Sequence, residues 1–393
     1  MIFEFIHKNR DREIISLDTA FNVESQWIQL DTSSKRNFII SFIPAFRNKQ
    51  KIVLLDKNHK QLQAFYEHND INQLTNIDKL SQLLFFTSGS SGFPVGAFKT
   101  EENLLSEVMV LKKLITQRQG IKRVVVSVPF VHIYGILAGL LLPLYLDDVT
   151  LVVKDDFLPY ELLEEASKEE TLVVTTPIFI KALARLQMQV DLSKTLFISS
   201  TAPLSFEDVE SFQQNYQTNI IQLFGSTETG GIAYKHNLDT QWSPLERVKI
   251  SIVDDKLSVS SPFVSHFLLQ NTLKKLQLPF TTEDIVKMEN EKFTLLGRSN
   301  KIIKIAGKRI SSALLEATLE TLESVEIAVV ELVYNKELLR SEQVLITLQA
   351  KEEIRKQAIK DKISECYGVL TIPFKVTYVK NINRSAMGKK ILF

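Results

Sequence analysis

Short apolar runs rich in β-branched residues recur along the central part of the chain, with helical stretches between them. The runs cover residues 123–128, 149–153, 171–175, 195–200 and 219–224. Near-continuous apolar strands that alternate with helices are typical of a mostly parallel sheet covered on both faces. The pattern therefore predicts an α/β fold for this region.

Towards the C-terminus the pattern changes. Alternation around Asp254 and Asp255, and again around Asn290, predicts hairpins over 247–260 and 284–296. After Gly297 we expect strands at 301–305, 327–334, 344–349 and 376–379 and helices at 311–322 and 351–366. This predicts a large N-terminal α/β domain, residues 1–299, with parallel-type sheets flanked by helices and a small β subdomain, followed by a small α+β domain, residues 300–393.

The longest apolar run, residues 133–146, is interrupted by Pro143 and closed by Asp147 and Asp148. Because it is shorter than the roughly 18 residues of a membrane span, we expect a buried helix and no integral membrane segment. The chain carries 47 Lys and Arg against 46 Asp and Glu, a balance that gives no reason to expect a nucleic acid as partner. The single cysteine, Cys366, excludes a disulfide framework and suits a reducing compartment. With no export signal visible at the start, we expect a cytoplasmic protein.

The densest signal for chemistry follows the apolar run 83–86. It consists of Thr87, Ser88, Gly89, Ser90, Ser91 and Gly92. Hydroxyl groups and unhindered backbone N–H groups at the end of a strand can wrap phosphate oxygens. Taken alone, the segment fits a flexible surface turn equally well. The Gly-Lys-Ser/Thr of the common nucleoside-triphosphatase loop does not follow it.

A second signal, residues 224–231, follows the apolar strand 219–223 and reads Phe-Gly-Ser-Thr-Glu-Thr-Gly-Gly. Ligands of open α/β sheets bind beyond the carboxyl ends of the strands. An aromatic ring, a hydroxyl and a carboxylate placed there could stack a base, bond a phosphate and hold a hard cation. The alternative is a glycine-rich loop with a purely structural role.

Together these two segments resemble motifs of the adenylate-forming superfamily, which comprises acyl-CoA synthetases, aryl-CoA ligases, luciferases and peptide-synthetase adenylation domains. Further segments continue the resemblance in the family's order. They are 129–135 (Pro-x-x-His-x-x-Gly), 199–204 (Ser-Gly-Gly-Ala-Pro-Leu in the family), 282–284 (Thr-Gly-Asp in the family), Gly297 and Arg298 with Lys304, Gly307 and Arg309, and 383–389 (Pro-Arg-Thr-x-x-Gly-Lys in the family). On these matches the chain is identified as a shortened member of the superfamily.

The resemblance implies a role for each matching residue. A nucleotide-binding set would hold the phosphates, adenine and ribose of ATP: Thr87, Ser88, Gly89, Ser90, Ser91, Gly92, Ala202, Phe224, Gly225, Asp284 and Arg298. Within it Phe224 would stack on adenine, Asp284 would bind the ribose hydroxyls, and Arg298 would reach ribose or phosphate. A catalytic set would consist of Thr227 at the α-phosphate, Glu228 as the Mg²⁺ ligand, Lys389 as the catalytic cation and His132 beside the acyl pocket. Without the resemblance, His132 reads as a core or capping residue.

The implied activity is ATP-dependent activation of a carboxylic acid. The acid would become an acyl-adenylate with release of pyrophosphate, and would then pass to the thiol of CoA or of carrier-protein phosphopantetheine. Mg²⁺, loop N–H groups and an ammonium group would offset the repulsion between the carboxylate and the phosphates. The C-terminal domain would be a mobile lid with its pivot at Asn300. Apolar residues near the pocket, Phe130, Tyr134 and Phe179, favour a fatty or aromatic acid.

Several positions depart from the family pattern. Val95 stands where the phosphate loop usually carries lysine, and Glu283, Ser200 and Thr201 replace glycines. We hypothesise that Lys99, nearby in sequence, supplies the missing cation. Two alternatives stay open: a non-catalytic nucleotide- or acyl-binding protein on the same fold, and an enzyme that stops at the adenylate.

Overall fold

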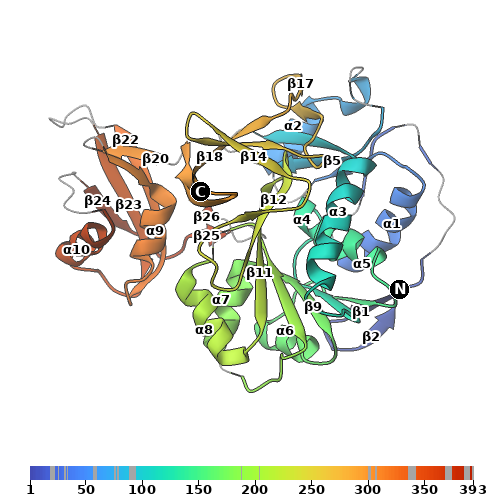
Figure 1. Cartoon of the computed structure of the whole chain (residues 1–393), viewed down its shortest axis with the longest axis horizontal. Helices are drawn as coiled ribbons and strands as arrows, with labels where there is room; N and C mark the ends of the chain where they lie inside the picture. The colour runs from blue at the N-terminus through green and yellow to red at the C-terminus, as the bar shows by residue number, and fades with distance from the viewer. Residues whose placement is uncertain are drawn as a thin grey trace. The chain divides into compact units, whose positions relative to one another are not determined.

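The computed structural model of the protein describes every residue except 18–22, 25, 31, 33, 56–59, 75, 76, 78, 88–93, 187, 203, 300, 301, 306, 307, 335–341, 368–373, 385–389, 392 and 393. The chain divides into two compact units. The first is Met1–Ser251 with Ser258–Phe280, and the second is Ile252–Leu257 with Thr281–Phe393. Figure 1 shows their helices and strands, coloured from blue at the N-terminus to red at the C-terminus.

The first unit contains the predicted α/β sheet. Its nine strands are β1 (Ile2–Ile6), β2 (Arg12–Ile14), β7 (Arg123–Val126), β8 (Thr150–Val153), β9 (Thr171–Thr175), β10 (Thr195–Ser199), β11 (Asn219–Ser226), β12 (Gly230–His236) and β13 (Ser243–Pro244). They lie in the order β13–β12–β11–β10–β9–β7–β8–β1–β2. The neighbours from β11 to β1 are all parallel, and β2, β12 and β13 add antiparallel edges. The prediction of a mostly parallel sheet is confirmed.

Helices cover this sheet, as the pattern predicts. One face packs against the helices α6 (Pro159–Ala166), α7 (Pro177–Leu186) and α8 (Phe206–Tyr216), grouped beside the strands in Figure 1. Leu162, Leu183 and Phe212 from these helices share a buried core with Val173 and Phe197 of the strands. Burial of such side chains is the main favourable term in folding.

The apolar run 133–146 forms a buried helical segment, also as predicted. It consists of α4 (Ile133–Ile136), a π-helical turn η2 (Leu137–Leu141) and α5 (Leu142–Leu144). A Cβ placed on Gly139 would lie 2.9 Å from a methyl of Val126, so the π-helical turn packs closely on β7. Among the described residues no helix is long and apolar enough to cross a membrane.

A second sheet in the first unit has six strands. They are β3 (Ile28–Gln29), β4 (Ile52–Leu54), β5 (Ser81–Thr87), β6 (Val95–Thr100), β16 (Phe267–Leu269) and β17 (Leu273–Lys275), in the order β17–β16–β6–β5–β4–β3. The remaining helices of this unit are α1 (Lys35–Arg47), α2 (Lys60–His68), the 3₁₀ turn η1 (Ile71–Gln73) and α3 (Glu101–Thr116). Helix α3 contacts β5 and β6 of this sheet and β12 of the nine-stranded sheet, so it links the two.

The second unit contains the predicted hairpins and the predicted α+β elements. Its elements, with the strands next to the division, are β14 (Lys249–Val253), β15 (Lys256–Ser260), β18 (Phe280–Glu289), β19 (Lys292–Arg298), β20 (Ile302–Ile305), β21 (Lys308–Ser311), α9 (Ser312–Leu319), β22 (Val325–Tyr334), β23 (Glu342–Ala350), α10 (Lys356–Tyr367), β24 (Phe374–Tyr378), β25 (Asn383–Arg384) and β26 (Lys390–Ile391). One sheet runs β14–β15–β18–β19 and another β22–β23–β24. The hairpins and the α+β elements are therefore confirmed. A domain boundary at 299/300 stays a prediction, because Asn300 lies outside the described residues and 281–299 group with the C-terminal part.

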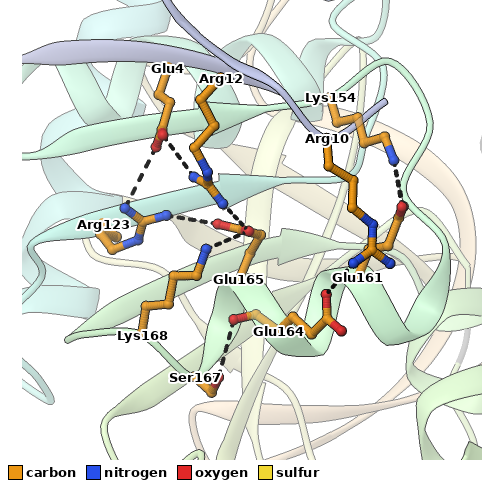
Figure 2. A network of polar contacts seen from close by, with 10 residues as sticks. All are labelled: Glu4, Arg10, Arg12, Arg123, Lys154, Glu161, Glu164, Glu165, Ser167 and Lys168. Carbon is orange, nitrogen blue, oxygen red and sulfur yellow. Dashed lines mark hydrogen bonds and ion pairs between the residues drawn. The ribbon is translucent and has the colours of Figure 1, made fainter. Parts of the chain in front are cut away.

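Buried ion pairs fasten the first strands to the sheet (Figure 2). Glu165 of α6 accepts hydrogen bonds from Arg12 of β2, from Arg123 of β7 at 2.9 Å and from Lys168 at 2.6 Å. Glu4 of β1 accepts from Arg12 at 2.7 Å. Burial raises the pKa of Glu165, but the hydrogen bonds and charges of Lys168 and Arg12 outweigh it, and the pKa ends below its usual value.

Replacing this carboxylate tests the network. We expect Glu165→Gln to lower the free energy of unfolding by about 3 kcal/mol at pH 7, because the nearly buried Arg123 and the half-buried Arg12 lose their counter-charge. Since the folded-state pKa of Glu165 is lowered, its contribution is present above the unfolded-state pKa and is lost as the pH falls below it. Chemical denaturation should therefore show that the difference in unfolding free energy between Glu165→Gln and wild type becomes smaller below about pH 4.

Glu164→Gln is the matched control on the same helix. Its side chain is 47% exposed and lies 3.8 Å from Arg10. An exposed pair of this kind contributes at most about 1 kcal/mol. Equal losses in the two variants at pH 7 would contradict a stabilising role of the buried network.

Candidate functional site

Residues 224–231 form a tight hairpin between two neighbouring strands. Strand β11 ends at Ser226 and β12 begins at Gly230. A Cβ on Gly225 would lie 2.2 Å from the carbonyl oxygen of Gly230, and Gly230 itself has a φ of +70°. Only glycine tolerates such an approach and such a backbone angle without strain. The glycines of the motif are therefore required by the turn itself.

Hydrogen bonds within the turn hold it together. Thr229 Oγ1 accepts a hydrogen bond from the Ser226 N–H at 3.1 Å and donates to the Gly230 carbonyl at 2.8 Å. The Thr227 and Glu228 side chains are half-buried, and within the described part of the chain neither has a hydrogen-bond or ion-pair partner. A hydroxyl and a carboxylate thus belong to neighbouring residues of a turn that is held by internal hydrogen bonds.

Lys99 lies beneath this turn. Its side chain is 1% exposed, and its ammonium donates to the carbonyl oxygens of Glu228 at 3.1 Å and Phe263 at 2.6 Å. The hypothesis that Lys99 supplies the missing phosphate-loop cation is therefore wrong, because its charge is occupied inside the protein. Burial lowers the pKa of Lys99, while the Glu107 and Glu228 charges oppose that shift.

Glu107 is a buried residue of this region that sequence reasoning missed. Its Oε1 accepts from the Gly231 N–H at 2.9 Å, and burial raises its pKa against the opposing effect of Lys99. The signal was present in the sequence. Leu104, Val108 and Leu111 mark the apolar stripe of α3, and Glu107 falls on that stripe where an apolar residue is expected.

Phe224, predicted to stack on adenine, ends the regular part of β11 before the turn. Its ring lies 5.3 Å from that of Trp242, centroid to centroid and tilted by 44°. The ammonium of Lys235 lies 4.8 Å from the Trp242 centroid. Burial lowers the pKa of Lys235, and Asp239 partly opposes the change. Trp242 therefore supports the Phe224 ring from one side.

The segment 129–135 turns into helix α4 at His132. A Cβ on Gly135 would lie 2.1 Å from the carbonyl oxygen of Pro129, which explains the paired proline and glycine of this motif. His132 is the N-cap residue of α4 and is half-buried, and its carbonyl accepts from the Ile136 N–H at 3.1 Å. His132 thus occupies the N-cap position without a side-chain hydrogen bond to the helix, and its place beside the acyl pocket stays a prediction.

Two aromatic residues expected near the acyl pocket have partners within the protein. Phe130 is 3% exposed and stacks on Phe38 of α1 with centroids 5.8 Å apart. The Tyr134 hydroxyl donates to the carbonyls of Thr175 at 3.2 Å and Ile198 at 2.9 Å, at the ends of β9 and β10. Burial raises the pKa of Tyr134. These contacts tie the segment to the carboxyl edge of the sheet.

The segment after β10 carries a backbone strain at a position where the family has glycine. Thr201 has a φ of +87°, which is unusual for a β-branched residue. The hydroxyl of Ser200 donates to the Leu223 carbonyl at 2.9 Å, next to Phe224. Ala202 is exposed beyond them. The segment is thus bonded to the strand that leads into the hairpin.

Asp284 and Arg298 belong to the second unit and face each other across the β18–β19 pair. Arg298 Nε lies 3.3 Å from Asp284 Oδ1, and Asp284 is 8% exposed. The neighbouring Glu283 accepts from Lys256 at 2.9 Å and from the Ser299 hydroxyl. Because successive strand residues point to opposite faces, Glu283 is directed away from Asp284. The replaced glycine therefore leaves the Asp284 face unchanged.

Several predicted site residues lie outside the described residues: Ser88, Gly89, Ser90, Ser91, Gly92 and Lys389. Thr87 ends β5 and pairs with Val95 of β6. Lys390, next to Lys389, is described. Its ammonium binds Glu316 at 2.9 Å, Glu320 at 2.7 Å and the Ala328 carbonyl at 2.7 Å, which anchors the C-terminal strand to its own unit.

The side chains of the hairpin fit a magnesium ion bound together with phosphate. Among the described residues no cluster of three or more potential ligands could hold a metal by itself. Mg²⁺ is usually bound by one or two carboxylates, with substrate phosphates and water completing its shell. Glu228, a half-buried carboxylate whose charge is close enough to act on buried Lys99, meets that requirement.

Comparison with known proteins places the chain in a family. The AMP-binding enzyme family matches residues 33–262, more than half of the sequence, so the chain belongs to this family. A 4-coumarate–CoA ligase of Cereibacter sphaeroides is 26% identical over 235 residues, 59% of this chain and 52% of that protein. A putative long chain fatty acid-CoA ligase, VraA of Staphylococcus haemolyticus, is 21% identical over 380 residues, 92% of this chain and 79% of that protein.

Solved structures share the fold. ATP-bound MatB from Rhodopseudomonas palustris superposes with a TM-score of 0.80 at 13% identity, covering 98% of this chain and 93% of that one. The O-succinylbenzoate CoA synthetase MenE of Bacillus subtilis, solved with ATP and magnesium, gives 0.76 at 18% identity, covering 93% and 88%. The sequence match spans only about half of the Cereibacter relative.

The close approach at Gly225 gives a direct test of the turn. We expect Gly225→Ala to lower the free energy of unfolding by about 2–3 kcal/mol, because the added methyl overlaps the Gly230 carbonyl. Gly120→Ala is the matched control, since a Cβ there meets nothing within 4 Å. It should be neutral or stabilise by up to about 1 kcal/mol. Denaturant titrations that give equal midpoints for both variants would contradict the geometry of the hairpin.

Proposed function

We propose that the protein is an AMP-forming acid–thiol ligase. In this proposal it activates a carboxylic acid with ATP as an acyl-adenylate, releases pyrophosphate, and transfers the acyl group to the thiol of CoA or of carrier-protein phosphopantetheine. The observation that carries the proposal is the hydrogen-bonded hairpin that places Thr227 and Glu228 in one turn, in a chain of the AMP-binding enzyme family.

The chain's own residues would bind and orient the reactants. The hydroxyls of the phosphate loop, Thr87 to Ser91, would hold the outer phosphates, and Thr227 would donate to the α-phosphate. Phe224 would stack on adenine, while Asp284 and Arg298 would contact the ribose. Bound Mg²⁺ would supply positive charge, with Glu228 as its protein ligand. Lys389 would stabilise the charge that develops as the carboxylate attacks the α-phosphate.

The acid is proposed to be a fatty or aromatic one. The relatives support this class, since one is named for 4-coumarate and another for long chain fatty acids. The names of similar proteins also bear on whether the acyl group passes to CoA or to a carrier protein. The curated relatives are named as CoA ligases, whereas one structure with the same fold, McyG, contains a carrier-protein domain. A lid role for residues 300–393 and a cytoplasmic location stay predictions.

A second candidate is a nucleotide- or acyl-binding protein that does not catalyse adenylation. Val95 stands where the phosphate loop usually has its lysine, and the burial of Lys99 removes the nearest substitute. Loss of a cation beside the departing pyrophosphate would slow adenylation. This candidate predicts nucleotide binding without turnover.

Carboxylate-dependent exchange of labelled pyrophosphate into ATP separates the two candidates. We expect exchange with members of a panel of fatty and aromatic acids, and a loss of about 100-fold or more in Glu228→Ala and Lys389→Ala, because each removes a charge that acts in the transition state. Lys380→Ala is the comparison, since it removes an exposed lysine from the same region. Exchange with no acid, or an unaffected Lys389→Ala variant, would contradict the ligase proposal.

Nucleotide binding can be followed through Trp242. The chain has two tryptophans, and Trp27 is buried in a separate core at 7% exposure. In a Trp27→Phe background we expect ATP to change the emission of Trp242 through Phe224. Phe224→Ala should weaken ATP binding about tenfold, the effect of losing one base–aromatic stack. Saturating ATP that leaves the emission unchanged would contradict the placement of adenine on Phe224.

A further inference from the structure

Three polar side chains lie buried where helix α3 meets the hairpin. Lys99, Asn103 and Glu107 are 1%, 3% and 6% exposed. Buried charged groups are costly unless they are paired and hydrogen-bonded. The groups that these three side chains bind should therefore explain why they are buried on β6 and α3.

All three bind backbone atoms of two adjoining segments. Lys99 donates to the carbonyls of Glu228 and Phe263, and Asn103 donates to those of Pro262 at 2.7 Å and Val264 at 3.3 Å. The Glu228 carbonyl also accepts from the Ser265 N–H at 2.8 Å. The backbone of Glu228 is thus held by two donors from outside its own hairpin.

Glu107 holds the other end of the turn. Its Oε1 accepts from the Gly231 N–H, and a Cβ on Gly230 would lie 2.4 Å from its Oε2. The carboxylate therefore packs directly on the two glycines that follow Thr229. Lys99 and Glu107 between them fix the backbone at Glu228 and at Gly231.

We propose that Lys99 and Glu107 form a buried clamp that positions the Thr227–Glu228 turn for its ligand. They are positioning residues, since both bind the turn through its backbone: Lys99 at the Glu228 carbonyl and Glu107 at the Gly231 N–H. The inference rests on the proposed function for the identity of the ligand, MgATP. The clamp also links the two sheets of the first unit. Lys99 belongs to β6 of the six-stranded sheet, the strand that follows the phosphate loop, and binds the β11–β12 hairpin of the nine-stranded sheet.

Hydrogen–deuterium exchange without any ligand tests the clamp. We expect Lys99→Met and Glu107→Gln to speed exchange of the amides at 226–232 about tenfold or more, because each removes a bond to a charged group. In the double variant Lys99→Met/Glu107→Leu no unpaired charge remains, so thermal stability should return towards wild type. Amide exchange in the turn should nevertheless stay fast in the double variant. If the two residues only stabilised the fold, exchange would slow again as the thermal stability returned.

The second readout is the Mg²⁺ concentration that gives half-maximal pyrophosphate exchange. It should rise about 10- to 100-fold in the single and double variants, the range usual for residues that orient a metal ligand. Arg123→Met is the matched control: it removes a buried cation at the start of β7, away from the hairpin. It should lower stability but leave both the exchange of 226–232 and the Mg²⁺ requirement unchanged.

The outcomes separate the clamp from the proposed activity. Unchanged exchange of 226–232 in the double variant would overturn the clamp, whatever the activity. If wild type shows no pyrophosphate exchange but the variants loosen the turn, the proposed activity fails and the clamp stands. If the turn loosens while the Mg²⁺ requirement is unchanged, a role of the clamp in placing Glu228 is overturned.

Discussion

A buried ammonium group must find several oxygen acceptors, and this requirement decides how the first unit fits together. Two lysines meet it with backbone carbonyls. Lys99 joins β6 to the hairpin, and Lys35, at the start of α1, donates to the carbonyls of Val126, Ser127 and Lys154 at 2.9–3.2 Å. Burial lowers the pKa of Lys35 to about 8. Carbonyls at strand ends have unused acceptor capacity, so a lysine can join elements there without disturbing the ladders.

Strand ends at the carboxyl edge of the nine-stranded sheet are bound together by side chains as well as by loops. Tyr134 joins the ends of β9 and β10, and Ser200 joins the segment after β10 to β11. Tyr134 thus ties helix α4 to two strands, and Ser200 ties the segment after β10 to the neighbouring strand. The edge where ligands of α/β sheets bind is thereby held rigid by its own protein, before any ligand is present.

The fold was largely predictable because its apolar periodicity is strong. The five central strands and the two hairpins were all found near their predicted positions, since near-continuous β-branched runs have few alternatives. The site was predictable as a set of motifs but not as geometry. Nothing in the local pattern shows that Lys99 points inward or that Glu107 reaches Gly231, because both contacts join residues more than a hundred positions apart.

The structural effect of residues that differ from the family's motifs was the hardest to predict from the sequence. Glu283 stands where the family has glycine, and its side chain is bound by Lys256 on the face of the strand opposite Asp284. Thr201 stands where the family has glycine and has a positive φ, a backbone angle that glycine adopts more easily. Charged residues at apolar positions, such as Glu107 on the stripe of α3, carried more information about buried contacts than the motifs did.

The place of β1 in the sheet has a consequence for biosynthesis. Its partner in parallel pairing is β8, with Ile2 opposite Thr150. At about 5–20 residues per second the ribosome needs on the order of ten seconds to make the chain between them. During that time β1 can pair only with β2, which follows it directly in the chain. Until β8 emerges, Phe3 and Phe5 lack the parallel neighbour strand beside which they are buried in the finished sheet.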